Sequence, residues 1–146
     1  MKQIADLIAD QTLTVLDPTL SVRNAAQRMT EKNIGAAAVV ESGKLAGVFS
    51  ERDIMARVVA KGLDPDGTTV GVVMSKDLVV AEPNDELFDA LQKMYSIRAR
   101  HLPVVDNGKL VGMVSLRDLL EVDDALQRAK ATFLSELVTY SPDYDP

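Results

Sequence analysis

The 146-residue sequence contains no cysteine and a single histidine, His101. The lack of cysteine excludes disulfide bonds and thiolate metal sites, and a lone histidine excludes a histidine-rich metal centre. No stretch reaches the ~18 to 20 apolar residues that a membrane-spanning helix needs. The first residues do not resemble a secretion signal, because Asp6 and Asp10 interrupt the apolar run that a signal requires. We therefore expect a cytoplasmic protein with no membrane partner.

Basic residues are outnumbered by acidic ones. The chain has 16 Lys and Arg against 22 Asp and Glu, which gives a formal net charge of −6 at pH 7. Nucleic-acid binding depends on clustered Lys and Arg, so we expect no nucleic-acid partner. The 47% of hydrophobic residues and 26% of charged residues are typical of a folded globular protein.

Motifs of catalysis are missing as well. The sequence has neither a Gly-x-x-x-x-Gly-Lys-Ser/Thr loop nor a Gly-x-Gly-x-x-Gly fingerprint. It has no cysteine nucleophile, and His101 has no evident serine or acidic partner in a catalytic arrangement. These absences predict that the chain is not an enzyme.

The sequence does contain an internal repeat. The segment Gly43–Ile54 returns 65 residues later as Gly108–Leu119, with seven of twelve positions identical. Each copy reads as a polar turn, an apolar strand and a helix that begins at a capping Ser-x-x-Asp. One copy alone buries too little apolar surface to be stable, so we expect the two copies to pack together as a pseudo-twofold pair.

The apolar periodicity predicts the same elements in each copy. The fold class is therefore α/β (α+β), with two β-α-β-β-α repeats forming one module. In the first copy, the predicted elements are a short helix at 4–8, a strand at 13–16, a helix at 22–33, strands at 36–40 and 45–49, and a helix from 50 to a cap at Gly62. In the second copy, they are a short helix at 70–74, a strand-like segment at 78–80, a helix at 87–94, strands at 102–105 and 110–114, and a helix from 115.

The repeats place the domain boundaries at 1–66 for the first copy and 67–122 for the second. Residues 123–146 follow as a C-terminal helix and a loose tail. The helix is predicted by an amphipathic stripe, whose members are Leu126, Ala129, Phe133, Leu134, Leu137 and Val138.

Over about residues 1–122, the chain resembles the cystathionine β-synthase (CBS) domain, which occurs in tandem pairs called Bateman modules. The resemblance is carried by features that occur in duplicate and in order, together with one basic and apolar run. These are Pro18 and Pro83, the motif Gly-x-x-Ser-x-x-Asp at Gly47, Ser50 and Asp53 and again at Gly112, Ser115 and Asp118, and the run Arg100–Val105.

This resemblance implies a disc-like pair that often forms a homodimer and binds an adenine compound between the repeats. Candidate ligands are AMP, ADP, ATP, NAD and S-adenosylmethionine, none of them an obligatory cofactor. By the same resemblance, Asp53 and Asp118 bind ribose hydroxyls, and Ser50 and Ser115 lie beside the phosphate. The adenine base is expected near 14–16 and 79–81 of the short strands and near the buried strands, with Thr14, Val15 and Val80 as the candidate residues.

The two copies differ where basic residues are expected to reach the phosphate of the other repeat. The second copy has Arg100 and His101, whereas the first has Gly35 and Ala36 at the same offset. The resemblance therefore predicts that the cleft containing Asp53 suits a charged nucleotide better than the cleft containing Asp118. Two further arginines stand inside the capped turns and are expected to contact either phosphate or neighbouring carboxylates, and these are Arg52 and Arg117.

Two functions stay open from the sequence. The first is a regulatory sensor of energy status or of a metabolite, in which a bound adenine nucleotide rearranges the repeats or the dimer and a protein partner responds. The alternative is a ligand-free dimeric scaffold that docks a partner through its C-terminal helix. The alternative has a physical basis, because Ser-x-x-Asp is also a capping box that stabilises a helix by roughly 1 kcal/mol without any ligand.

Overall fold

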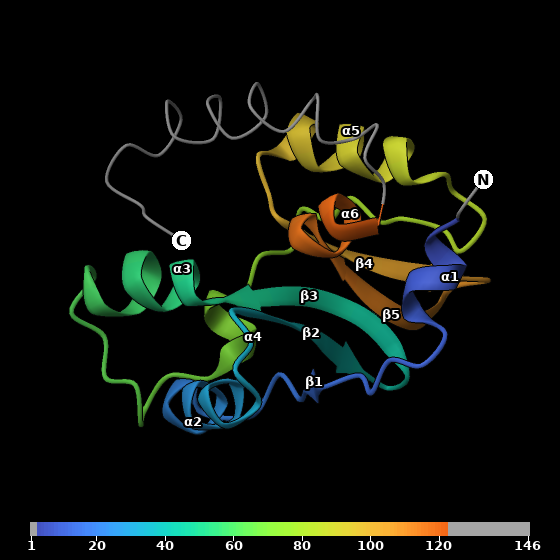
Figure 1. Ribbon diagram of the computed structural model, residues 1–146. Coiled ribbons are helices and arrows are strands. Elements are labelled where there is room, and N and C mark those ends of the chain that lie inside the picture. The colour runs from blue at the N-terminus through green and yellow to red at the C-terminus, as the bar shows by residue number, and fades with distance from the viewer. Residues whose placement is uncertain (1–2, 123–146) are drawn as a thin grey trace.

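The computed structural model describes residues 3–122, which form two similar α/β units that pack against each other (Figure 1). The predicted C-terminal helix lies outside these residues. The lower unit in Figure 1 contains β1 (Val15–Leu16), α2 (Val22–Lys32), β2 (Ala36–Glu41), β3 (Lys44–Ser50), α3 (Glu51–Asp53), the π-helical η1 (Ile54–Val59) and α4 (Val70–Val73). The upper unit contains α1 (Ile4–Ile8), α5 (Leu87–Ile97), β4 (His101–Asp106), β5 (Lys109–Ser115) and α6 (Leu116–Val122).

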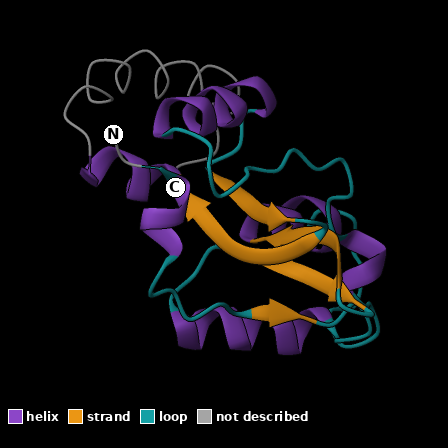
Figure 2. Ribbon diagram, turned by 90° about the vertical axis from the view of Figure 1, so that its right-hand side faces the viewer, coloured by secondary structure: helices purple, strands orange, loops and turns teal. Residues whose placement is uncertain are grey.

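The strands of both units lie toward the middle of the molecule, and helices lie on the outer sides (Figure 2). In the first unit the sheet order is β1-β2-β3, with β1 parallel to β2 and β2 antiparallel to β3. In the second unit β4 pairs antiparallel with β5. Strands β3 and β5 contact each other where the two units meet. The predicted fold class is thus confirmed.

The two hairpins turn in the same way. Ser42 and Gly43 have φ values of 52° and 78°, and Asn107 and Gly108 have 51° and 79°. Two consecutive residues with positive φ are what a type I′ turn requires, and this turn matches the twist of the strands that it joins. The polar turns predicted before each Gly-x-x-Ser-x-x-Asp motif are therefore confirmed in both copies.

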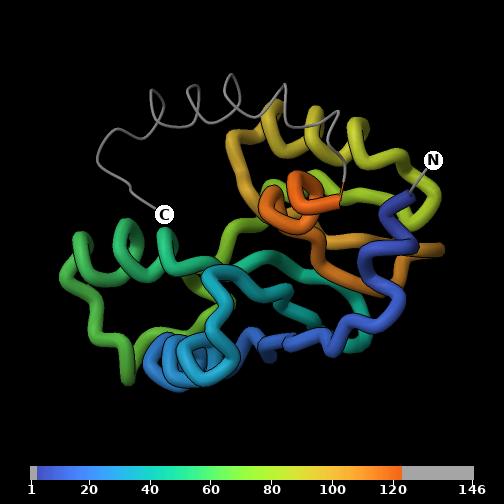
Figure 3. The backbone as a smooth tube through the Cα atoms, viewed as in Figure 1, coloured from blue at the N-terminus to red at the C-terminus, as the bar shows by residue number. Residues whose placement is uncertain are grey.

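The short helices α1 and α4 exchange places between the repeats. Ile4 of α1 is fully buried in the core of the second unit, where α1 packs on β5. Val70 and Val73 of α4 are buried in the core of the first unit, where α4 packs on β3. Figure 3 shows the result for the blue N-terminal stretch, which runs from α1 in one unit to β1 in the other. The two cores therefore do not follow the order of the repeats in the sequence.

The strand-like segment predicted at 78–80 does not form a strand. It is replaced by a single parallel bridge between Ala81 and Val104, in which the Ala81 N–H donates to the Pro103 carbonyl at 2.9 Å. In the first copy, the position of Pro103 is occupied by Ala38, which pairs with Val15 in β1. Proline has no N–H, so it cannot extend the parallel ladder. Finally, no helix within residues 3–122 is long and apolar enough to cross a membrane.

Candidate functional site

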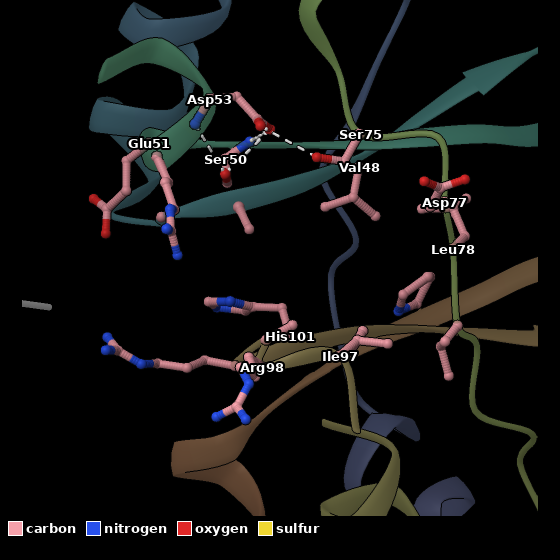
Figure 4. A pocket seen from close by; sticks show the side chains of 17 residues that line it. Val48, Ser50, Glu51, Asp53, Ser75, Asp77, Leu78, Ile97, Arg98 and His101 are labelled. Carbon is pink, nitrogen blue, oxygen red and sulfur yellow. Dashed lines mark hydrogen bonds between the residues drawn. The ribbon is translucent and has the colours of Figure 1, made fainter. Parts of the chain in front are cut away.

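Two clefts lie between the repeats, and each contains one copy of the Ser-x-x-Asp turn. The Asp53 cleft has a cavity of 270 Å³, and its walls come from the 50–53 turn, the crossing segment 75–79 and the segment 97–101 that ends α5 and begins β4. Figure 4 shows Ser50 and Asp53 on one wall, with Arg98 and His101 on the facing wall. The Asp118 cleft is larger, at 1080 Å³, and is lined by 11–14 of the other crossing segment.

The Ser50–Asp53 turn is a complete capping box. The Ser50 N–H donates to Oδ2 of Asp53 at 2.9 Å, and the Asp53 N–H donates to Oγ of Ser50 at 3.2 Å. The Ser50 hydroxyl also donates to Oδ2 of Asp53, at 3.1 Å. These bonds fix the carboxylate at the start of α3 and occupy one of its two oxygens, so the turn is well formed without a ligand.

The other oxygen of Asp53 faces the connection to the second repeat. The Ser75 hydroxyl donates to Oδ1 at 3.2 Å, and the Nε of Arg57 lies 3.7 Å from the same oxygen. Asp53 is buried, with only 6% of its surface exposed. A carboxylate offers about four acceptor positions, and Asp53 accepts three bonds from Ser50 and Ser75. Oδ1 therefore retains the capacity to accept another hydroxyl.

Gly47 allows the crossing segment to lie against β3. A Cβ at this position would be 2.6 Å from Sδ of Met74 and 2.8 Å from the carbonyl oxygen of Ser75. Contacts this short do not occur between real atoms, so only glycine fits without movement. The close approach lets Val48 and Ser75 exchange two backbone hydrogen bonds, at 3.0 and 2.9 Å. The glycine of the motif thus places Ser75 beside Asp53.

The Asp118 cleft is built in a different way. Ser115 and Asp118 repeat two capping bonds, each of 3.1 Å. The crossing segment, however, contacts β5 through a side chain. Nε2 of Gln11 donates to the Met113 carbonyl at 2.7 Å, and the Met113 N–H donates to Oε1 of Gln11 at 2.8 Å. Met113 corresponds to Val48 in the first copy, so a side-chain amide replaces the backbone of Ser75.

The structure places most of the predicted site residues in one cleft or the other. Arg52 lines the Asp53 cleft, and Thr14 and Arg117 line the Asp118 cleft. The Arg117 guanidinium is bound to Glu121, with Nε 3.0 Å from Oε1. Two predicted residues of the short strands lie outside the lining of both clefts, and these are Val15 and Val80. Val79, the neighbour of Val80, lines the Asp53 cleft.

Arg100 and His101 line both clefts, together with Gly35, Ala36 and Glu51. Burial lowers the pKa of His101, while Asp118 and Glu51 oppose this effect and Arg100 adds to it. The imidazole is therefore neutral at pH 7, with one nitrogen that donates and one that accepts. The two clefts are separated by a shared wall that carries one permanent cation and one neutral ring.

The unpredicted residues of the clefts include three with a clear structural role, namely Ser75, Gln11 and Arg98. Ser75 belongs to no motif. It reaches Asp53 because Gly47 lets the crossing segment lie close to β3. Gln11 contacts a residue 102 positions away, and no local pattern indicates such a contact. Arg98 had an available signal, because it stands 65 residues after Asn33, the predicted end of the first long helix. Among the described residues, no group of three or more His, Asp or Glu side chains is arranged to hold a metal ion.

Comparison with known proteins assigns the family. The family model described as "CBS domain" matches residues 4–60 and 64–125. The chain belongs to the CBS domain family. Its two repeats are thus CBS repeats, and the resemblance inferred from the sequence is confirmed.

Curated relatives match most of the length of this chain. The chain is 43% identical to the CBS domain-containing protein YhcV of Bacillus subtilis over 119 residues, which cover 82% of this chain and 84% of YhcV. It spans 62% and 59% of the length of two other curated relatives, which are longer.

Solved structures share the fold. The CBS-domain containing protein ATU1752 from Agrobacterium tumefaciens has a TM-score of 0.76 at 29% identity, covering 82% of this chain and 98% of that one. The CBS domain protein PAE2072 from Pyrobaculum aerophilum, whose structure is a complex with AMP, has a TM-score of 0.77 at 29% identity and covers 90% of this chain and 99% of that one.

Proposed function

We propose that the protein is a regulatory module that binds an adenine nucleotide between its CBS repeats. The observation that carries this proposal is the Asp53 cleft, in which a carboxylate with spare acceptor capacity faces Arg100 and His101 across a cavity of 270 Å³. Ligand pockets for small molecules commonly enclose about 300 to 1,000 Å³, so this cavity suits a compact ligand such as a mononucleotide. The AMP complex of PAE2072, a protein 29% identical to this chain, supports the choice of ligand class.

Each part of a nucleotide meets suitable chemistry in this cleft. One ribose hydroxyl donates to Oδ1 of Asp53, the carboxylate oxygen that Ser50 leaves open. The phosphate lies beside Ser50 and is neutralised by arginines, of which Arg52 and Arg100 line the cleft. The adenine base occupies the apolar part of the lining, which consists of Val48, Leu78, Val79, Ile97 and Pro103. AMP is the ligand that we favour, and ADP, ATP, NAD and S-adenosylmethionine share the adenosine part.

Ligand binding can change the arrangement of the repeats because the two walls of the Asp53 cleft come from different units. Asp53 and Ser75 are bonded to the first unit, while Arg98, Arg100 and His101 come from the second. A ligand that bridges these walls binds best to one arrangement of the repeats and shifts the population toward it, provided that its affinity for the two arrangements differs. The proposal includes a cytoplasmic homodimer that transmits this change to a regulated protein partner, and it assigns no catalytic step to the chain.

A ligand-free scaffold is the second candidate function. It is favoured by one observation, namely that three hydrogen bonds already satisfy the buried carboxylate of Asp53. A cleft that is stable without a ligand can simply be a structural joint between the repeats. The docking helix of this candidate lies outside the described residues.

Calorimetric titration of the 146-residue chain separates the two candidates. AMP, ADP, ATP, NAD and S-adenosylmethionine are each titrated up to millimolar concentration, with GMP as the control for the base. We expect saturable binding of at least one adenine compound and weaker binding of GMP. Silence of all five adenine compounds would contradict the sensor and leave the scaffold.

A further inference from the structure

The end of helix α5 has an unusual backbone. Arg98 has φ 54° and ψ 41°, the left-handed region, and its N–H donates to the carbonyls of Met94 and Tyr95. Within residues 3–122, the non-glycine residues with positive φ are Asn33, Ser42, Arg98 and Asn107. Asparagine tolerates this region because its short side chain bonds locally, whereas a long side chain has no such compensation. Arg98 therefore carries a conformational strain.

The helix does not need an arginine to end in this way. Asn33 occupies the same position 65 residues earlier, with φ 54° and ψ 46°, and its N–H donates to the carbonyls of Met29 and Thr30. The two helix ends are thus built alike, and asparagine performs the capping task at lower cost. Strained residues of this kind concentrate at functional sites. The strain at Arg98 therefore indicates a functional role for its side chain.

The two equivalent residues line different clefts. Arg98 lines the Asp53 cleft, and Asn33 lines the Asp118 cleft. In Figure 4, Arg98 stands on the wall that faces Ser50 and Glu51. One backbone position therefore supplies a guanidinium to the first cleft and a neutral carboxamide to the second.

Arg98 also changes the balance of charge in its cleft. The permanently charged residues that line the Asp53 cleft are Arg52, Arg98, Arg100, Glu51, Asp53 and Asp77. Three cations minus three anions give zero, and without Arg98 the sum would be −1. In the Asp118 cleft, two cations minus three anions already give −1, the residues being Arg100, Arg117, Glu51, Asp118 and Glu121. A phosphate monoester, which is an anion, therefore meets a less negative lining in the cleft that contains Arg98.

We propose that Arg98 is a phosphate-binding residue of the Asp53 cleft and makes this cleft select phosphorylated adenosine over adenosine itself. The inference rests on the proposed nucleotide-binding function and names the part of the ligand that Arg98 reads. A guanidinium is suited to this task because its fork of N–H groups can donate two hydrogen bonds to one phosphate. The strain of the left-handed backbone is then the cost of directing this fork into the cleft.

The test compares AMP with adenosine in calorimetric titrations of Arg98→Asn, which copies the residue of the other repeat. Arg98→Gly is a second variant that also tolerates positive φ, and Arg28→Gln removes one exposed arginine of α2, outside both clefts, as the control for net charge. We expect both Arg98 variants to lose about tenfold or more of their affinity for AMP, since charge-assisted hydrogen bonds are lost, and to change by less than about twofold for adenosine. Arg28→Gln is expected to match the unmodified chain.

Thermal melting without ligand provides the second readout. Because asparagine and glycine both accept positive φ, we expect both Arg98 variants to keep their melting temperature within about 3 °C of that of the unmodified chain. In variants that melt like the unmodified chain, unchanged AMP affinity or an equal loss for AMP and adenosine would contradict the role of Arg98 while leaving nucleotide binding intact. If the unmodified chain binds neither AMP nor any other adenine compound, the proposed function fails as well, and the two failures are thus distinguished.

Discussion

The two clefts share one motif and differ in what faces it. In the Asp53 cleft, the Ser75 backbone bonds the strand before the turn, the Ser75 hydroxyl bonds Asp53, and Arg98 lines the cleft. In the Asp118 cleft, the side chain of Gln11 bonds the strand before the turn, and Asn33 lines the cleft. Duplication therefore produced two equal starts of a helix and two unequal clefts. The difference teaches that the Ser-x-x-Asp motif alone does not determine what a cleft binds.

The largest contrast is expected from the glycines of the motif. Gly47→Ala places a Cβ 2.8 Å from the backbone carbonyl of Ser75, whereas the nearest atoms to a Cβ at Gly112 belong to side chains of Ile8 and Gln11. The Ser75 carbonyl is bonded to the Val48 backbone, whereas the segment of Ile8 and Gln11 is bonded to β5 through a side chain and can shift more easily. We therefore expect Gly47→Ala to lower the free energy of unfolding by about 2 to 3 kcal/mol and Gly112→Ala by about 1 to 2 kcal/mol. Urea denaturation of both variants measures this, and equal losses would mean that the two crossing segments are equally rigid.

A second contrast concerns the crossing segments themselves. Gln11→Ala removes two hydrogen bonds to Met113, while Ser75→Ala removes one side-chain bond and keeps its backbone bonds to Val48. We expect losses of about 1 to 2 kcal/mol for Gln11→Ala and about 1 kcal/mol or less for Ser75→Ala, again by urea denaturation. A larger loss for Ser75→Ala would show that the Ser75–Asp53 bond holds the repeats together more strongly than the Gln11 contact.

Arg100 lines both clefts, so its substitution tests which of the two clefts it serves in ligand binding. Arg100→Ala is expected to weaken AMP binding about tenfold, equivalent to about 1.4 kcal/mol, because the phosphate loses a cation. The cleft affected should be the one that Asp53→Ala also affects. If Arg100→Ala instead weakens only binding that depends on Asp118, the assignment of Arg100 to the Asp53 cleft is wrong.

The smallest expected effect is a dependence on pH. Burial lowers the pKa of His101 below its ordinary value of 6.5, so the unfolded chain binds the proton more readily than the folded chain. The contribution of neutral His101 to stability is therefore fully present above pH 6.5 and is lost as the pH falls through and below that value. Unfolding measured between pH 5 and pH 8 should show a smaller slope in His101→Gln, and an identical slope would exclude His101 as its source.

Much of the fold followed from the sequence because the relevant signals are local. Ser21 and Asn33 mark the ends of α2, and the turn residues Gly43 and Gly108 mark the hairpins. The exchange of α1 and α4 did not follow, because an apolar stripe such as that of Val70 and Val73 shows that a helix is buried but not in which core. Pro103 is a sequence signal against a strand at 78–80, because it has no N–H to donate to a parallel neighbour. The sequence alone does not show that segment 78–81 lies beside Pro103.

The site was predictable to a different extent on each wall. The Ser50–Asp53 wall was indicated by a repeated motif, and its bonds are formed within four residues. The facing wall includes Ser75 and Arg98, whose roles depend on contacts across the repeats and on the left-handed φ of a single residue. The contact of Ser75 leaves no motif in the sequence, and the only signal for Arg98 is its place 65 residues after Asn33. The predicted roles of individual residues in ligand binding stay predictions.

The most direct test of the central claim is a calorimetric titration of AMP into Asp53→Asn and Asp118→Asn. Both variants replace a carboxylate that accepts the N–H of the capping serine, but Asp53→Asn also alters the bond from Ser75, so the melting temperature of both variants without ligand is measured alongside. We predict that Asp53→Asn loses about tenfold or more of the affinity of the tightest AMP site, whereas Asp118→Asn retains it. Loss in Asp118→Asn alone, or no loss in either variant, would contradict the account.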